Sequence, residues 1–376
     1  MVKGVKQTVQ DFLDRADVKI DGKRPWDIQV NNQNLYTRVL RGGPLALGEA
    51  YMDGWWDCEA LDQFFNRILR LKLKLNFNMK IQVIKWFAWN VIKAKIVNQQ
   101  RKSKANLIGE QHYDIGNDLY KSMLGKRMEY SCGYWKNAKK LDKAQEAKLD
   151  LICRKLNLKP GMSILDIGCG WGSLAKYAAE KYQVKVVGIT ISKNQVKLAR
   201  ELCKGLNIKI LLMDYRNLKE KFDRIVSVGM FEHVGYKNYR KFIKIVDNCL
   251  KDTGLFLLHT IGGNKSVVSV NPWIDKYIFP NGMLPSAKQI TKAYEGIFRL
   301  EDWHSFGIYY DKTLMAWYRN FNKNWDKIKN NYDERFHRMW NYYLLSCAGA
   351  FRAHKNQLWQ IVFAKIGSQI DYEGIR

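Results

Sequence analysis

Long apolar runs are absent from this sequence. No uncharged stretch reaches the roughly 18 apolar residues that a helix needs to cross a bilayer. Residues 1–18 alternate charged and apolar side chains and lack the apolar core of a signal peptide. We therefore expect a cytoplasmic chain whose contacts with a membrane are peripheral.

Paired cysteines are also absent. The seven cysteines form no C-x-x-C pair and no spacing typical of a zinc site. Disulfide frameworks usually combine an even number of cysteines in a short secreted chain. The pattern argues against a disulfide scaffold and against a metal site, and it indicates a reducing environment.

Acidic side chains are scarce beside basic ones. The chain has 36 Asp and Glu against 63 Lys and Arg, a formal net charge of +27. Such an excess attracts polyanions, which means nucleic acid or an anionic membrane. Residues 67–104 hold eleven basic side chains and no acid. Within them, residues 81–97 predict a helix that either packs on the core with its lysines extended to solvent or lies on a membrane surface.

The length of 376 residues, with 47% hydrophobic residues, argues for a folded chain larger than one usual domain. Turn signals such as Gly42-Gly43-Pro44 interrupt the N-terminal part. We expect a small mixed or helical N-terminal domain with the basic connecting segment at residues 1–98. The catalytic domain is expected at residues 99–376.

From residue 160 onward, apolar runs alternate regularly with helix-like segments. This pattern predicts an α/β fold with a parallel sheet covered by helices on both faces. Regularity lapses between Gly262 and Pro285, which predicts a long loop over the site. The predicted strands are residues 163–167, 185–190, 208–213, 224–228 and 255–260, with strand-like segments near 299–309 and 358–365 that bracket helices at 312–329 and 333–355.

The first strand leads into ILDIGCGWGSL, residues 164–174, with glycines at Gly168, Gly170 and Gly172. Glycine lets the backbone approach a ligand where a side chain would clash. The dinucleotide pattern G-x-G-x-x-G is not matched, because its third position falls on Ser173. Together with Asp166, the pattern D-x-G-x-G-x-G after a strand resembles the first motif of the Rossmann-like class I S-adenosylmethionine-dependent methyltransferases.

The second predicted strand departs from that class, whose members usually end it with an acidic residue that holds the ribose. Here it ends in GITIS, so the hydroxyl of Thr190 or the amide of Gln195 is the candidate ribose contact. The S-x-x-Q that begins at Ser192 is equally a helix capping box. Asp214, after the third strand, is placed either to meet the adenine or simply to end the strand in a turn.

Several long segments resemble the cyclopropane-fatty-acyl-phospholipid synthases and the related mycolic acid cyclopropane synthases. The N-terminal block, which the shorter mycolic enzymes lack, indicates the phospholipid branch. Besides the glycine motif and GITIS, the matching segments read LALGEAYMDGWWD (residues 45–57), QHYDIGNDLY (111–120), YSCGYW (130–135), MFEHVG (230–235), LLHTIGG (257–263), YYDKTLMAWY (309–318) and YYLLSCAGAFRA (342–353).

The resemblance implies two sets of site residues. One is a small-anion site for bicarbonate, built from Cys132, Glu232, His259, Ile261 and Tyr310. Cys347 matches a cysteine that has been considered catalytic in this family, and we interpret it as a pocket residue. The implied contacts of S-adenosylmethionine are Tyr130, Ser131, Asp166, Gly168, Gly170, Gly172, Thr190, Gln195, Asp214 and Tyr215.

The implied reaction makes chemical demands that these residues can meet. An isolated alkene is a poor nucleophile without a proton to lose, so catalysis must hold it in line with the sulfonium methyl. Aromatic faces can stabilise the resulting carbocation, and a base must remove one proton before the ring closes. Glu232 or His259 could be that base, or both could position bicarbonate, in which case Glu232 and the anion share a proton. Cys132 is better suited to positioning than to nucleophilic attack, since a covalent intermediate would not help.

Rival functions find less support. The place where base-amine methyltransferases carry N-P-P-Y reads GMFEHVG, and no Pro-Cys dipeptide exists for attack on cytosine, so we expect no nucleic-acid substrate. A methyltransferase acting on another lipid, one forming methyl-branched fatty acids, and a lipid-binding scaffold stay open. We expect unsaturated phospholipids of an anionic membrane as partners, a possible homodimer, and a peripheral location on the cytoplasmic side of the inner membrane.

Overall fold

The computed structural model describes residues 2–71, 116–268 and 270–376. Its first part contains helices α1, α2 and α3 and a two-stranded antiparallel sheet of β1 and β2. The predicted turn at Gly43-Pro44 is a kink inside α2, where Gly43 has a φ of 57°. The bounds are α1 Val2–Asp14, β1 Gln29–Val30, α2 Leu35–Met52, β2 Trp56–Asp57 and α3 Leu61–Arg70.

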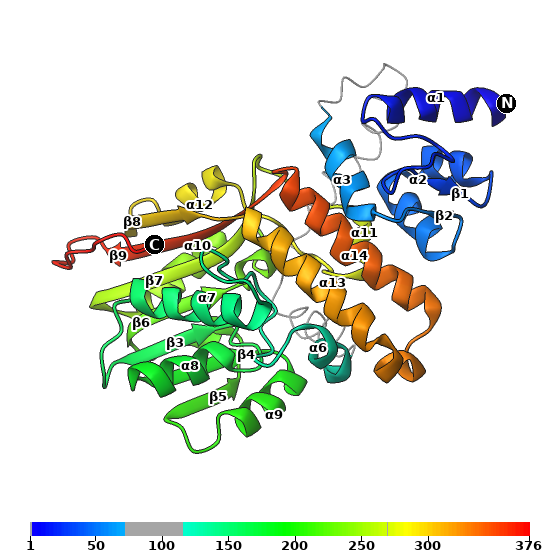
Figure 1. Ribbon diagram of the computed structural model, residues 1–376. Helices are drawn as coiled ribbons and strands as arrows, with labels where there is room; N and C mark the ends of the chain where they lie inside the picture. The colour runs from blue at the N-terminus through cyan, green and yellow to red at the C-terminus, as the bar shows by residue number, and fades with distance from the viewer. Residues whose placement is uncertain (1, 72–115, 269) are drawn as a thin grey trace.

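A seven-stranded sheet forms the centre of the remaining chain, in the order β5-β4-β3-β6-β7-β9-β8 (Figure 1). The five strands from β5 to β7 are parallel, as the alternating pattern predicts, and β9 and β8 extend the sheet antiparallel to them. The bounds are β3 Ser163–Ile167, β4 Lys185–Thr190, β5 Ile208–Leu212, β6 Phe222–Val228, β7 Leu250–Gly263, β8 Phe298–Ser305 and β9 Asn356–Lys365.

Helices cover both faces of this sheet, as predicted. Alternate residues of each strand face opposite sides, and each face buries its apolar set under different helices. One face packs under α7 and α8 and includes Val226 and Leu257. The other packs under α10 and α12 and includes Ile225 and Phe256. The bounds are α7 Leu141–Lys155, α8 Ser173–Tyr182, α9 Lys193–Leu202, α10 Tyr239–Cys249 and α12 Ala287–Tyr294.

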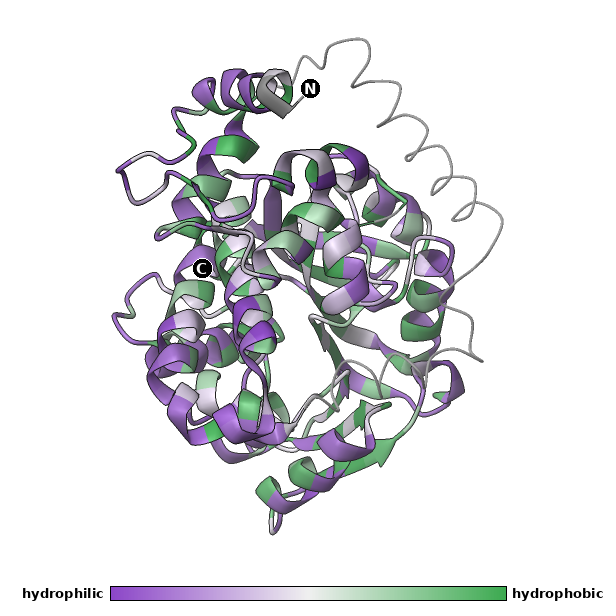
Figure 2. Ribbon diagram, turned by 90° about the vertical axis from the view of Figure 1, so that its right-hand side faces the viewer, coloured by the Kyte–Doolittle hydropathy of each residue, from purple (hydrophilic) through white to green (hydrophobic). Residues whose placement is uncertain are grey.

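Beyond the carboxyl ends of the parallel strands lies a second group of helices, rich in aromatic residues. It comprises α6 Asn117–Met123, α11 Pro272–Tyr277, α13 Ile308–Ile328 and α14 Glu334–Arg352. One hydrophobic cluster joins these helices to the N-terminal helices and includes the fully buried Trp56, Tyr120, Trp317 and Trp340. Figure 2 shows hydrophilic and hydrophobic residues alternating along the helices, as expected when each helix buries one face.

Two details differ from the sequence expectation. The segment near residues 299–309 is not one strand, because β8 ends at Ser305 and α13 begins at Ile308. Aromatic residues favour strands and hid this boundary, which Gly307 marks as the first residue of the helical turn. The predicted loop after Gly262 also contains α11, whose N-terminus Asn271 caps by accepting hydrogen bonds from two backbone N–H groups.

The basic stretch lies largely outside the described residues, including Lys80, Lys85, Lys93 and Lys95. Its first two cations are described, and both contact the protein itself. Arg67 pairs with Asp17 at 3.0 Å, and Arg70 donates to the carbonyl of Arg352 at 3.3 Å. The helix predicted for residues 81–97, and with it the choice between packing on the core and lying on a membrane, falls outside the described residues. Within the described part of the chain, no helix has the length and apolar character needed to cross a membrane.

Candidate functional site

The turn after β3 is built by glycines in left-handed backbone conformations. Gly168, Gly170 and Gly172 have φ values of 84°, 54° and 83°. A Cβ at Gly168 would lie 2.7 Å from the Cβ of Met230, and one at Gly172 would lie 3.0 Å from the Sγ of Cys203. A Cβ at Gly170 would meet no atom within 4 Å. Only Gly170 therefore points toward open space.

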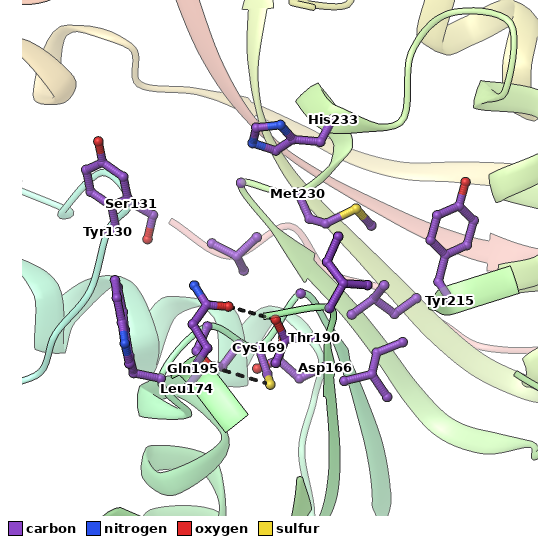
Figure 3. Close-up of a pocket in the computed structure, with 18 of the residues that line it drawn as sticks. Tyr130, Ser131, Asp166, Cys169, Leu174, Thr190, Gln195, Tyr215, Met230 and His233 are labelled. Carbon is purple, nitrogen blue, oxygen red and sulfur yellow. Dashed lines mark hydrogen bonds between the residues drawn. The ribbon is translucent and has the colours of Figure 1, made fainter. Parts of the chain in front are cut away.

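That space is a pocket at the carboxyl ends of the parallel strands, where ligands bind in such sheets (Figure 3). Nine of the ten cofactor residues named from the sequence line it: Tyr130, Ser131, Asp166, Gly168, Gly170, Thr190, Gln195, Asp214 and Tyr215. Gly172 does not line it. Its lack of a side chain instead allows the start of α8 to pack against Cys203 and Ala199.

Thr190 and Gln195 form one connected wall of the pocket. Thr190 Oγ1 donates to Gln195 Oε1 at 2.7 Å and accepts from the backbone N–H of Ser192 at 3.2 Å. Ser192 caps α9 by accepting from the Gln195 N–H, so half of the expected capping box forms. The Gln195 side chain turns to Thr190 instead of closing the box, as Figure 3 shows. Its amide nitrogen is the end that can donate to a ligand.

Asp214 ends the strand in a turn, which is one of its two expected roles, and it also lines the pocket. Its carboxylate accepts from the backbone N–H of Arg216 at 2.9 Å, which caps the short helix η2, Tyr215–Asn217. It also pairs with the Arg216 guanidinium at 2.9 Å, and both side chains line the pocket. Burial raises the pKa of Tyr215 to about 12, so its ring is neutral. Tyr215 lies across the pocket from Tyr130 and Ser131 (Figure 3).

A buried charge cluster that we did not expect from the sequence lies beneath Ser131. Lys148, which is fully buried on α7, pairs with Glu129 and donates to Ser131 Oγ at 3.0 Å. Burial, and next the negative charge of Glu129, raise the pKa of Asp166 to about 7. Lys148, Glu129 and Asp166 all line the pocket. The cluster can hold the segment that carries Tyr130 and Ser131 in place.

A signal for Lys148 exists in the sequence. Ala144, Lys148, Ile152 and Lys155 recur at spacings of four, four and three, which places two lysines on the buried face of one helix. A second missed residue is His233, which lines the pocket and whose pKa burial lowers to about 4. Within the segment MFEHVG, no sequence feature indicated that His233, as well as Glu232, lies at the site.

Glu232 and Ile261, both named for the anion site, are in direct contact. Glu232 lies in the short helix η3, Phe231–His233, and its Oε1 accepts from the Ile261 N–H at 2.6 Å. Its buried Oε2 has no hydrogen-bond partner among the described residues. Burial raises the pKa of Glu232 to about 7, although the Ile261 hydrogen bond opposes this shift. The carboxyl group is thus poised to gain or lose a proton near neutrality.

His259 precedes Ile261 by two residues on β7, so both side chains leave the same face of the strand. The ring is 1% exposed, and its Nε2 has no partner within the described part of the chain. Burial lowers the pKa of His259 well below its usual range, and the charges of Lys148 and Lys155 act in the same direction. The imidazole is therefore neutral.

Cys132 and Tyr310 lie close to this group but are not activated. Cys132 is fully buried, with its Sγ 3.3 Å from the Gly133 carbonyl oxygen and 3.7 Å from Thr313 Oγ1. Burial raises the pKa of this thiol, which excludes a thiolate nucleophile at neutral pH. Burial likewise raises the pKa of Tyr310 well above its usual range.

Aromatic rings pack around Tyr130 and Tyr310, one residue from each of the two groups. Tyr310 stacks on Phe351 with ring centroids 4.6 Å apart, and Tyr130 lies 5.3 Å from Trp317. Tyr130 Oη donates to Tyr343 Oη at 2.9 Å. Burial raises the pKa of the Cys347 thiol to about 12, so it too stays protonated. Such a lining can bind an apolar chain and stabilise a cation.

Comparisons with known proteins agree on one family. Residues 99–361 match the family described as mycolic acid cyclopropane synthetase. The cyclopropane-fatty-acyl-phospholipid synthase of Escherichia coli K12 is 54% identical over 357 residues, which cover 94% of this chain and 92% of that protein.

Solved structures of cyclopropane synthases share the fold. Cyclopropane synthase MmaA2 from Mycobacterium tuberculosis superposes with a TM-score of 0.66 at 31% identity, over 69% of this chain and 98% of that one. Mycolic acid cyclopropane synthase CmaA1, in complex with SAH and CTAB, gives a TM-score of 0.65 at 33% identity, with the same coverage of 69% and 98%.

Proposed function

The chain belongs to the mycolic acid cyclopropane synthetase family, and we propose that it builds cyclopropane rings into the unsaturated acyl chains of membrane phospholipids. It is an S-adenosylmethionine-dependent methyltransferase with a class I α/β fold, and it acts on lipid. The finer assignments are proposals: the phospholipid substrate of an anionic surface, the use of bicarbonate, and the roles of individual residues.

The observation that carries the proposal is the pair of unsatisfied polar atoms beside the cofactor pocket. Glu232 Oε2 and His259 Nε2 are buried without partners among the described residues. Leaving buried polar groups unpaired costs free energy, so such atoms in a folded protein indicate that a ligand binds there. A small anion that can accept from His259 and share a proton with Glu232 fits both atoms.

The proposed anion contacts are Glu232, His259, the backbone of Ile261, Cys132 and Tyr310. When bound, S-adenosylmethionine supplies the methyl group, and bicarbonate supplies the base for the proton that this methyl must lose. Glu232 is positioned by the Ile261 N–H and holds a proton at its free oxygen near neutral pH. Cys132 contributes its backbone to the anion site, and its side chain stays a neutral thiol.

The remaining residues orient the two reactants. We assign Thr190 and Gln195 to the ribose, Asp214 and Tyr215 to the adenine, and Tyr130 and Ser131 to the cofactor's amino-acid end. The aromatic rings of Tyr130, Trp317 and Tyr310 then exclude water and face the developing carbocation. Cys347 lines the acyl-chain side without taking part in bond making.

The cellular setting follows the same proposal. We propose that the protein works on the cytoplasmic face of the inner membrane as a peripheral protein, attracted by its net charge of +27. The division into residues 1–98 and 99–376 and a homodimer also stay predictions. The buried cluster that joins the N-terminal helices to α13 and α14 means that a separated N-terminal part would expose apolar surface.

Turnover measured with and without bicarbonate tests the anion site. We expect the parent enzyme to slow in bicarbonate-free buffer and to recover on addition. Glu232→Gln keeps the shape of the side chain but removes its titrating proton, so kcat should fall by roughly 100-fold or more, the usual range for a positioned acid or base. Cofactor affinity, measured by calorimetry, should be unchanged. Parental turnover by Glu232→Gln in bicarbonate-free buffer would show that the anion site is misassigned.

A further inference from the structure

Three polar side chains form a row across the sheet at the edge of the anion site. His259 on β7 lies opposite Gln360 on β9, and Gln360 lies opposite His304 on β8. Residues paired in this way project from the same face of a sheet. Gln360 and His259 are 0% and 1% exposed. The described site has no role for Gln360, although a buried amide on a central strand is costly to keep.

The contact between Gln360 and His259 has a defined direction. Gln360 Nε2 lies 3.3 Å from His259 Nδ1. An amide nitrogen can only donate, so Nδ1 must accept and carries no proton. A neutral imidazole has one proton, which must then be on Nε2. The atom left to face a ligand is therefore a donor.

Burial, and next the charges around the histidine, lower the pKa of His259 and keep the ring neutral. On the α7 side lie the buried ammonium groups of Lys148 and Lys155, which oppose a positive ring. Lys155 is itself paired with Asp302 at 2.7 Å. His304, on the far side of Gln360, has a pKa lowered to about 4 by burial, so it adds no charge. The carboxyl group of Glu232 accepts a hydrogen bond from the backbone N–H of Ile261.

We propose that Gln360 is a positioning residue that fixes His259 in the tautomer with the proton on Nε2, so that His259 donates to the bound anion. The inference rests on the anion site proposed above. If Nε2 instead presented a lone pair, it would repel an anion, and a ring that became an imidazolium would take up the proton that Glu232 shares with the anion. The hydrogen bond that the Gln360 amide donates to Nδ1 avoids both outcomes without adding a charge.

Nitrogen NMR of the holoenzyme tests the tautomer directly. The protein is labelled with ¹⁵N-histidine, and the His259 signals are identified among the six histidines by their loss in His259→Asn. We expect an unprotonated Nδ1 and a protonated Nε2 at neutral pH. A protonated Nδ1 in the parent protein would overturn the proposal.

Two substitutions extend the test. Gln360→Glu replaces the donor by an acceptor, so the proton should move to Nδ1 and the titration midpoint of His259 should rise. Gln360→Met keeps the size and removes the donor, and it serves if the buried glutamate prevents folding. Its Nδ1 signal should shift toward that of a nitrogen without a hydrogen bond. His259 signals unchanged in a folded variant would contradict the proposal.

Activity gives a second readout with a matched control. In Gln360→Met, kcat should fall by roughly 10- to 100-fold, by analogy with the loss seen when the hydrogen-bond partner of a metal-binding histidine is removed. The KM for S-adenosylmethionine should not change. Gln357→Glu, on the same strand but bonded to Asn264, is the control and should retain the parental kcat and His259 signals. If turnover did not depend on bicarbonate while NMR showed the expected tautomer, the anion site would be refuted and the tautomer assignment would stand.

Discussion

At the scale of single residues, Gly170 is the position where a side chain should block the cofactor. A Cβ there enters open pocket space, so Gly170→Leu should abolish S-adenosylmethionine binding by calorimetry. The substitution also carries a backbone strain of roughly 1–2 kcal/mol, because a non-glycine residue disfavours positive φ. Gly161→Leu is the matched control, since Gly161 has a φ of 82°, open space around its Cβ and no place in the pocket. Equal cofactor affinity in both variants would exclude our placement of the site.

Glu232 should make the protein less stable as the pH rises from 4.5 to about 7. Its carboxyl has a pKa of about 7 when folded against an ordinary value of 4.5, so the folded state binds a proton that the unfolded state has released. The free energy of unfolding therefore falls as pH rises between these two values. Glu232→Gln should escape this loss and gain up to about 3 kcal/mol relative to the parent above pH 7.

The measurement is denaturant unfolding at about pH 5 and about pH 8, without bicarbonate, where the linkage predicts a small and a large difference. Glu220→Gln, at an exposed position, is the control and should behave like the parent at both pH values. A Glu232→Gln variant that is equally destabilised at both would show that the carboxyl is ionised throughout.

At the scale of secondary-structure elements, the pair of Lys148 on α7 with Glu129 should couple stability to cofactor binding. Lys148→Met leaves Glu129 and Asp166 buried without their cation, which should cost roughly 3–5 kcal/mol of stability. Cofactor affinity should fall as well, since the Tyr130–Ser131 segment loses its anchor. Glu129→Gln combined with Lys148→Met should recover part of both losses.

Lys155→Met is the control for the Lys148 variants. Lys155 forms the other buried ion pair of α7, with Asp302, and does not line the cofactor pocket. It should lose stability to a similar degree while S-adenosylmethionine affinity is retained. If both lysine variants bind the cofactor equally well, the Lys148 cluster is only structural.

The elements that the sequence predicted well are those with a single dominant signal. Strands β3 and β4 match their predicted ranges, because a strand buried on both faces reads as a continuous apolar run. The end of β8 was wrong, since Trp303 and Tyr309 suit a strand and a helix alike. The pairing of Gln360 with His259 depends on which strands are neighbours in space. That order is not visible along the chain.

For the site, the sequence motifs identified most of the residues, and the structure showed which of their atoms lack hydrogen-bond partners. The cofactor residues named from the glycine motif and the family resemblance line one pocket, apart from Gly172, whereas Cys347 and the residues named for the anion site do not line it. Their ligand contacts stay predictions. The resemblance named Glu232 and His259 but could not say which of their atoms lack partners, because that depends on the β7–β9 register and on the Ile261 contact.

At the scale of the whole molecule, the positive charge should draw the protein to anionic lipid. Changing Lys80, Lys85, Lys93 and Lys95 to Gln should weaken vesicle binding at low salt, each charge being worth up to about 1 kcal/mol near the surface. The effect should shrink at high salt, where screening already weakens these contacts. Cofactor affinity should not change. Equal co-sedimentation of parent and variant with phosphatidylglycerol vesicles would move the membrane contact to another surface.

The central claim is that the methyl carbon of S-adenosylmethionine ends in a ring on a phospholipid acyl chain. The most direct measurement incubates purified protein with methyl-labelled S-adenosylmethionine and vesicles of cis-unsaturated phospholipid, followed by mass spectrometry and NMR of the released fatty acids and head groups. The account predicts label in a cyclopropane methylene at the former double bond and none in the head group. Label in an N-methyl group, or in a methyl branch without a ring, would contradict it.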